Sequence, residues 1–146
     1  MAFEFSLSVL LRLRENLEHK ELLVLEKHYA NIARIQARLL EAEQNILHAQ
    51  ERRQEELSHG TLAAEVKFTV DEERRIREYR ETLLQELLEA QKRLKEQLVI
   101  YWKARQKRDV LQELRKHQFD AYRSEQAKIE QRDRDELFLL RLRRKR

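Results

Sequence analysis

The sequence predicts an all-α protein, a long antiparallel two-helix coiled-coil hairpin with a C-terminal overhang. Three observations support this. The 146 residues include one Gly and no Pro, charged residues make up 40% of the chain, and Leu, Ile and Val recur at helical spacing. Because turns draw heavily on Gly and Pro, such a chain cannot form a many-stranded sheet, sandwich or barrel. Its regular apolar spacing excludes a disordered polyampholyte, so it must consist of helices that bury a narrow apolar seam.

The helix boundaries rest on two local signals. Gly60, the only Gly, lies in the one interior break, Ser58-His59-Gly60-Thr61, and suits the left-handed conformation that ends a helix. Further on, Thr69-Val70-Asp71-Glu72 fits the S/T-x-x-E capping box that starts one. We therefore expect a single hairpin domain over 1–146, with helix 1 from about Ser6 to Leu57, a turn region over 58–69, and helix 2 from about Val70 to Leu142.

Each predicted helix carries apolar residues at alternating spacings of three and four, the seam of a left-handed coiled coil. Near the start of helix 1 the apolar positions shift to Leu10, Leu13, Leu17 and Val24, which we interpret as a stutter in the seam. The regular seam of helix 1 is Ile32, Ile35, Leu39, Ala42, Ile46 and Ala49. That of helix 2 is Leu83, Leu87, Ala90, Leu94, Tyr101, Ala104 and Leu111, interrupted by Gln97 and Arg108.

The register of the hairpin follows from which residue numbers face each other, because the numbers of facing residues sum to a constant. A sum of 129 pairs Ile46 with Leu83 and Ala42 with Leu87, and a sum of 136, one heptad away, matches about as well. We favour 129 because its midpoint, at Ala64 and Glu65, falls between the two helix-end signals. With either sum, residues from Leu137 onward have no part of helix 1 opposite them and form the overhang.

The charge distribution is uneven. The chain has a net charge of +4, and the last ten residues contribute five positive charges and no acid. The rest is close to neutral, which argues against a general nucleic-acid-binding surface. The sequence has no Cys, no basic segment typical of a signal peptide at its start, and no apolar run of the roughly 20 residues that span a bilayer. We expect a soluble cytoplasmic protein.

No motif indicates catalysis or ligand chemistry. The sequence lacks a glycine-rich phosphate loop, an H-E-x-x-H pair and a Gly-framed serine, and its five His residues are scattered. A two-helix rod also offers no desolvated cleft in which a general acid could work. We expect no enzyme activity, no catalytic residue, no cofactor and no metal site.

Two apolar features suggest partner contacts. Trp102 follows the seam residue Tyr101, and because adjacent helical residues face about 100° apart, it should lie at the flank of the seam. Phe138, Leu139 and Leu140 lie in the predicted overhang, where they would form an exposed apolar patch next to the basic end.

Several residues resemble the flagellar export protein FliJ family. At the start these are Phe3-x-Phe5-x-Leu7-x-Val9-Leu10 and Leu13-Arg14-Glu15. In the second half they are Trp102, Arg105-x-Lys107-Arg108, Leu111-x-x-Leu114, Tyr122, Glu125-Gln126 and Asp135-Glu136. The resemblance covers the whole chain.

The resemblance implies a non-enzymatic stalk or adaptor of the flagellar type III export apparatus, peripheral to the inner membrane at the flagellar base. Its implied partners are a hexameric export ATPase, the membrane protein of the export gate and export chaperones, with no specific nucleic acid. The gate-facing patch would be Tyr79 and Leu83. The ATPase-facing end would carry both termini, with Phe3, Phe5, Leu7, Tyr122, Phe138, Leu139, Leu140, Arg143 and Arg144.

Three alternatives remain at this point. The first is the equivalent stalk of a virulence type III secretion system, although the Phe3-x-Phe5 opening favours the flagellar protein. The second is a basic-tailed coiled-coil adaptor that binds nucleic acid or anionic membrane, for which a steep salt dependence of binding would be the signature. The third is an intermolecular coiled coil in which unbroken helices pass through Gly60, which a concentration-dependent mass by light scattering would reveal.

Overall fold

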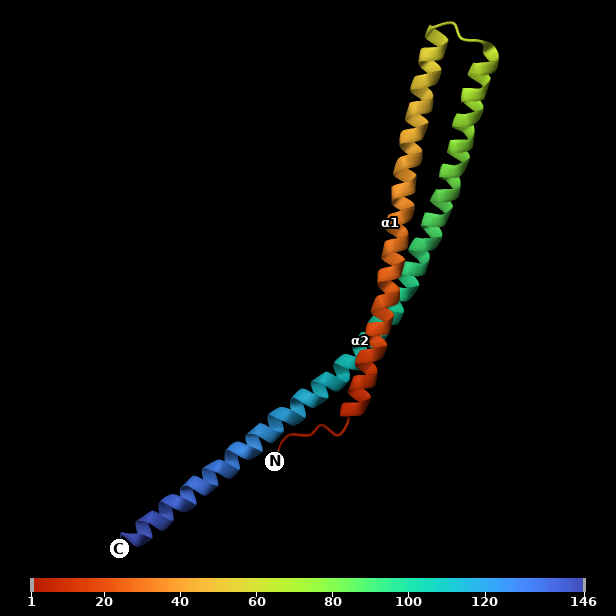
Figure 1. Cartoon of the computed structure of the whole chain (residues 1–146). Coiled ribbons are helices and arrows are strands. Elements are labelled where there is room, and N and C mark those ends of the chain that lie inside the picture. Colours follow the sequence, from red (N-terminus) through yellow and green to blue (C-terminus); the bar gives the residue numbers. More distant parts are fainter. Residues whose placement is uncertain (1, 146) are drawn as a thin grey trace. The chain divides into compact units, whose positions relative to one another are not determined.

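The computed structural model describes residues 2–145, and Met1 and Arg146 lie outside the described residues. Two helices account for almost all of this range (Figure 1): α1, Ser8–Ser58, and α2, Ala63–Arg144. The all-α prediction is confirmed. So is the assignment of the one interior break to the region of Gly60.

The turn between the helices closes α1 with hydrogen bonds to the carbonyl oxygen of Glu56. Gly60 adopts the left-handed conformation, with φ of 70°. The Thr61 amide then reaches back five residues to donate to the Glu56 carbonyl at 3.1 Å, and the Thr61 hydroxyl donates to the same oxygen at 2.7 Å. Bonds of this kind satisfy carbonyls that the end of a helix leaves unpaired. The single Gly therefore ends α1, as the sequence predicts.

The second helix starts earlier than expected. The amides of Glu65 and Val66 donate to the Leu62 carbonyl, so α2 begins at Ala63, and the expected start near Val70 is wrong. Thr69 lies inside the helix, where its buried hydroxyl donates to the Glu65 carbonyl at 3.1 Å and to the Glu56 carboxylate at 2.9 Å. The hydroxyl that resembled a helix cap thus bonds to the preceding turn and to α1.

The chain forms two compact units. Among the described residues, unit 1 comprises 2–20 and 102–145, and unit 2 comprises 21–101. Both helices contribute to both units.

In unit 2 the two helices lie side by side and run antiparallel from the turn (Figure 1). The predicted seam is confirmed here, because all six regular seam residues of α1 are buried. On α2, Leu83 and Ala90 are buried, and Leu87 and Leu94 pack against the same cluster. Burial of this narrow stripe is the main source of stability for helices of such polar composition.

The expected register is wrong, both as 129 and as 136. In unit 2, Glu43 pairs with Arg80 and Gln50 with Glu73, so the numbers of each pair sum to 123. Glu56 pairs with Thr69, which gives 125. The error follows from the early start of α2. A turn of four residues puts the midpoint of the hairpin near residues 61 and 62, whereas the expected twelve-residue turn put it near 64 and 65.

Unit 1 has its own small core. Phe5, Leu11 and Leu111 are buried together, and Phe3 packs against them. The expected shift of the α1 seam to Leu10, Leu13, Leu17 and Val24 is wrong, because the three Leu side chains are exposed and only Val24 is half-buried. The buried positions are Leu11 and Glu18, which continue a heptad spacing, and the polar character of Glu18 hid this continuation in the sequence.

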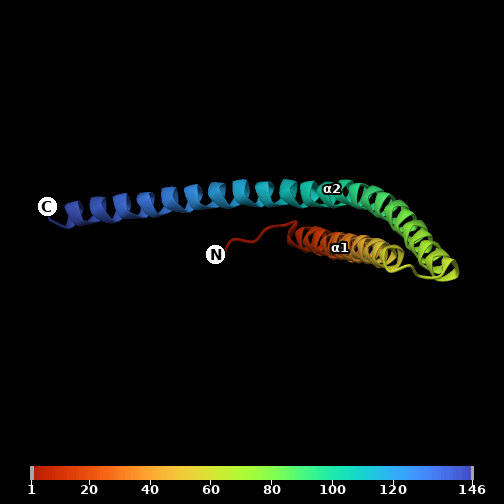
Figure 2. The ribbon, with the colours of Figure 1, turned by 90° about the horizontal axis from the view of Figure 1, so that it is seen from above.

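The overhang is longer than predicted. The segment before α1 reaches as far along α2 as Phe119 and Tyr122, through ring contacts of Phe3. Residues 123–145, which comprise the last part of α2 and Lys145 after it, are exposed apart from half-buried Gln126. Figure 2 shows this part of α2, in blue, continuing past the N-terminal segment. The residues from Leu137 onward lie in the overhang, as predicted, but the overhang begins earlier. The observed register sets each residue of α2 opposite a residue of α1 that is nearer the N-terminus than expected.

Candidate partner-binding surfaces

A buried carboxylate lies at the turn end of unit 2. Glu73 is 5% exposed and accepts hydrogen bonds from Arg53 at 2.6 Å, Gln50 at 3.3 Å and Arg77 at 2.8 Å. The bond from Arg77, together with the Gln50 bond and the charge of Arg53, holds the pKa of Glu73 below its ordinary value despite its burial. Glu73 is therefore ionised and fully partnered, which identifies it as a structural group. In the sequence Glu73 directly follows the S/T-x-x-E motif at 69–72 and resembles an acid of a first helical turn, so its burial was not predicted.

A second polar contact in unit 2 joins Gln97 to Glu21. The Gln97 amide, 7% exposed, donates to the Glu21 carboxylate at 2.6 Å and to the Glu21 carbonyl at 3.2 Å. Gln97 occupies a seam position, as its place in the apolar pattern indicates. The interruption of the seam is thus a buried hydrogen-bonded layer.

Unit 1 carries an equivalent layer at the other interruption. Arg108 donates to the Glu18 carboxylate at 2.5 Å and to Asp109 at 2.8 Å, and Glu18 is 9% exposed. The hydrogen bond to Asp109 and the charge of Glu18 raise the pKa of Arg108. The charged groups of this layer, Arg108 and Glu18, are therefore paired with each other.

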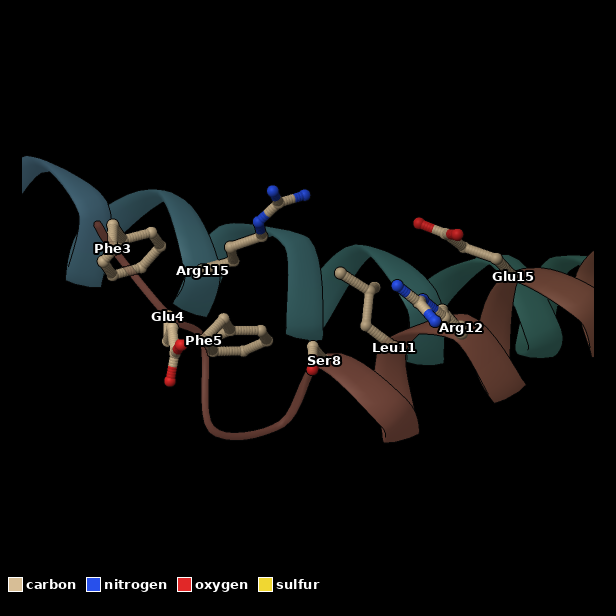
Figure 3. Close-up of a pocket in the computed structure, with 8 residues that line it drawn as sticks. All are labelled: Phe3, Glu4, Phe5, Ser8, Leu11, Arg12, Glu15 and Arg115. Carbon is tan, nitrogen blue, oxygen red and sulfur yellow. The ribbon is translucent and has the colours of Figure 1, made fainter. Parts of the chain in front are cut away.

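The N-terminal segment, with Phe3 and Phe5, lies beside α2 in unit 1 (Figure 3). The Phe3 ring stands edge-on to Phe119 at 5.2 Å between centroids and is tilted against Tyr122 at 5.6 Å. Phe5 is 7% exposed and belongs to the core of unit 1, whereas Leu7 is exposed. Of the predicted ATPase-facing residues, Phe3, Phe5 and Tyr122 therefore cluster within unit 1. Because Phe5 is buried in the core of unit 1, little of its side chain is accessible to a partner.

The remaining predicted residues of that end lie on the overhang. Phe138, Leu139 and Leu140 are each more than half exposed, as is Leu137, and Leu142 is nearly half exposed. Arg143 and Arg144 are exposed in the last turn of α2, next to Arg141 and Lys145. Arg146, the remaining cation of the basic end, lies outside the described residues.

The apolar residues of the overhang surround its helix. Four consecutive residues, Leu137 to Leu140, advance by about 100° each, so together they face every direction around the axis. A helix that is apolar on all sides is buried when it functions, whereas one that lies on a flat surface keeps a polar face. This segment is the largest run of exposed apolar side chains along α2 that no described residue covers.

The two residues of the predicted gate-facing patch differ in exposure. Tyr79 is 49% exposed and lines a shallow groove with Arg38, Asn45, Arg75 and Ile76. Leu83 is 1% exposed and lies in the core of unit 2. A patch on the outside of this unit could therefore use Tyr79 but not Leu83.

Trp102 lies outside the seam. It is 51% exposed, and the guanidinium of Arg105 lies 5.0 Å from its ring centroid, within cation–π range. The indole is thus placed at the flank by the same helical geometry that turns Tyr101 toward the seam.

Within residues 2–145, no three His, Cys, Asp or Glu side chains converge in a way that could hold a metal ion. Over the same residues, neither helix has a stretch long and apolar enough to cross a membrane.

These features define a class: a long two-helix coiled-coil hairpin whose second helix extends beyond the first. The family model of the flagellar FliJ protein matches residues 3–146, essentially the whole chain, so the chain belongs to the flagellar FliJ family. Comparison with curated proteins and with solved structures gave no match. Membership makes the chain a component of the flagellar export apparatus, in a family of structural or adaptor proteins that interact with the export machinery.

Proposed function

We propose that this chain is the central stalk of the flagellar type III export apparatus. In this role it inserts its overhang into the ring of the hexameric export ATPase and couples that ring to the export gate at the inner membrane. The match to the flagellar FliJ family favours the flagellar apparatus over a virulence secretion system.

The observation that carries the proposal is the apolar circumference of the overhang. Leu137 to Leu140 face all sides of one helix, and no described residue covers them. A ring can surround such a helix and bury every one of these side chains at once, whereas a flat partner would leave some of them in water. Burial contributes about 1.5–3 kcal/mol for each Leu or Phe.

The basic end adds an electrostatic preference for the partner. Arg141, Arg143, Arg144 and Lys145 follow the apolar segment, and their exposed side chains make this end of the overhang positively charged. We infer an acidic rim around the apolar socket of the ATPase, which would accelerate association more than it would tighten the final complex.

The stalk would act without chemistry of its own. Because its faces differ, it would contact the subunits of a ring differently, and differential contacts shift subunits between conformations. Tyr79 on the outside of unit 2 would contribute to the gate contact. Export chaperones would be further partners.

The test is binding and turnover with the purified export ATPase. Changing Phe138, Leu139 and Leu140 to Ser together should weaken binding by several kcal/mol and abolish any stimulation of ATP hydrolysis, since each loses about 1.5–3 kcal/mol of burial. Removing Arg143 and Arg144 should mainly slow association and flatten its salt dependence.

A matched control tests whether the effect belongs to the overhang. Changing Leu40, Leu47 and Leu88 to Ser removes three similarly exposed apolar side chains of unit 2 and should leave ATPase binding unchanged. If both triple variants bind the ATPase as the original chain does, the stalk proposal is wrong. Tight, salt-sensitive binding to heparin or to anionic vesicles, without ATPase binding, would support the basic-tailed adaptor instead.

A further inference from the structure

The apolar seam of unit 2 does not by itself select one register. A slip of one heptad toward a longer turn would place Ile46 opposite Leu83 and Ala42 opposite Leu87, which again sets apolar residues against apolar residues. This follows from the strict heptad spacing of buried residues on both helices.

The turn does not select the register either. The slipped hairpin needs about seven more residues in its turn, and the sequence offers a second helix start at that distance. Thr69-Val70-Asp71-Glu72 forms an S/T-x-x-E motif that would cap a helix starting at Val70, seven residues after Ala63, the observed start of α2. Melting 63–69 would therefore leave a well-capped shorter helix.

The buried polar side chains of unit 2 distinguish the two registers. In the observed register, Glu73 meets Gln50 and Arg53. A one-heptad slip toward a longer turn would move Glu73 opposite Leu57 and would bring Arg53 opposite Arg80. The opposite slip would bring Glu73 opposite Glu43. Both slips take Gln50 and Arg53 away from the Glu73 carboxylate and leave it only Arg77 of its own helix. Removing partners from a buried charge is costly.

The polar layer of unit 1 also distinguishes the observed register from registers slipped by one heptad. Arg108 meets Glu18 in the observed register. A slip of one heptad in either direction would place Arg108 opposite a Leu of α1. Single polar residues at seam positions are known to fix register in coiled coils at some cost in stability.

We propose that two buried polar layers, Glu73 with Gln50 and Arg53 in unit 2 and Arg108 with Glu18 in unit 1, select one register of the hairpin. They thereby set the length of the overhang. A slip of one heptad changes how far α2 extends past α1 by about seven residues, or roughly 10 Å at 1.5 Å per residue. The inference concerns the free chain and does not depend on the proposed ATPase partner.

Disulfide crosslinking in the full chain tests this directly, because the sequence contains no Cys that could interfere. The pair Glu43→Cys with Arg80→Cys reports the observed register, since these side chains form an ion pair at 3.7 Å. The pair Glu43→Cys with Leu87→Cys reports a slip of one heptad. Each pair is introduced into the original chain and into a layer-free chain that carries Glu73→Leu, Glu18→Leu and Arg108→Leu, together with Gln97→Leu, which removes the layer of Gln97 and Glu21.

In the original chain we expect crosslinking only through 43 and 80. In the layer-free chain we expect helicity to be retained and the crosslink between 43 and 87 to rise several-fold. A chain carrying only Glu73→Gln should keep the observed register, because the amide oxygen still accepts a hydrogen bond from Arg53.

Three outcomes would overturn the proposal. The first is crosslinking of the original chain through both pairs, which would mean that nothing selects the register. The second is a layer-free chain that crosslinks only through 43 and 80, which would assign the register to the apolar seam. The third is loss of helicity in the layer-free chain, which would show that the layers hold the hairpin together without choosing between registers.

Discussion

Replacing Leu83 with Ala tests the core of unit 2. Leu83 is 1% exposed and packs in a cluster with Ile35, Leu39 and Ala42. The change removes three buried carbon groups at about 0.8 kcal/mol each, or about 2.4 kcal/mol. Fully enclosed Leu-to-Ala changes cost about 2.7–5 kcal/mol because a cavity remains. Since a hairpin two helices thick can partly collapse, we expect a loss of about 2–3 kcal/mol, near the lower end.

The assay is urea unfolding followed by the helical circular dichroism signal, with thermal unfolding as a second measure. At about 3 °C per kcal/mol for a chain of this size, the melting temperature should fall by roughly 6–9 °C. Leu88→Ala is the matched control, since Leu88 is 67% exposed and its loss should change stability by no more than about 0.5 kcal/mol. If Leu83→Ala and Leu88→Ala prove equally mild, the assignment of Leu83 to the core is wrong.

Three further predictions follow from other parts of the molecule. Because the folded state lowers the pKa of Glu73, its contribution to stability is present above the unfolded pKa of about 4.3 and is lost as the pH falls through the lower folded value. Glu73→Gln should therefore flatten the acid limb of a pH–stability curve, and an unchanged limb would contradict the assignment. Phe5→Ala should cost up to about 3 kcal/mol locally and raise hydrogen exchange in residues 8–20, while exchange in unit 2 stays unchanged. Gly60→Ala should cost roughly 1–2 kcal/mol in urea unfolding, entirely from its φ of 70°, because no atom lies within 4 Å of the added Cβ; an unchanged midpoint would refute this.

The parts of the fold that rest on local physics could be predicted from the sequence. Gly60 ends α1 because only Gly enters the left-handed conformation without strain, and the chain has no other Gly. The seam from Ile32 to Ala49 was predictable because apolar spacing decides which face of a helix is buried. Gln97 and Arg108 stood out as interruptions of this spacing, although their partners did not.

The register could not be predicted because it depends on pairs of distant polar side chains. A heptad pattern repeats every seven residues, so apolar spacing gives several equivalent answers. Thr69 resembled a helix cap, yet its hydroxyl bonds within α2 and to Glu56. Glu73 resembled a first-turn acid, yet it is a buried partner of Arg53. The same polar residue types serve caps and buried layers, and only the tertiary contacts distinguish the two uses.

Among the candidate partner surfaces, too, one feature was predictable from the sequence and another was not. The exposure of Phe138, Leu139 and Leu140 was predictable because no part of helix 1 lies opposite them in any of the registers considered. The burial of Phe5 was not predictable, because Phe5 lies in a short segment before the helix, where no repeating apolar pattern indicates which side chains are buried. Its burial depends on Leu111, more than a hundred residues away in the sequence.

The most direct test of the central claim is photo-crosslinking from the overhang in a motile bacterium. A photoreactive amino acid is placed singly at each position from 137 to 140, and at position 40 as a control on exposed unit 2. We expect all four overhang positions to crosslink to the export ATPase, identified by mass, because a ring would enclose every side of the helix. We expect no such crosslink from position 40. Crosslinks from only one side of the overhang, or from position 40 alone, would contradict the central claim.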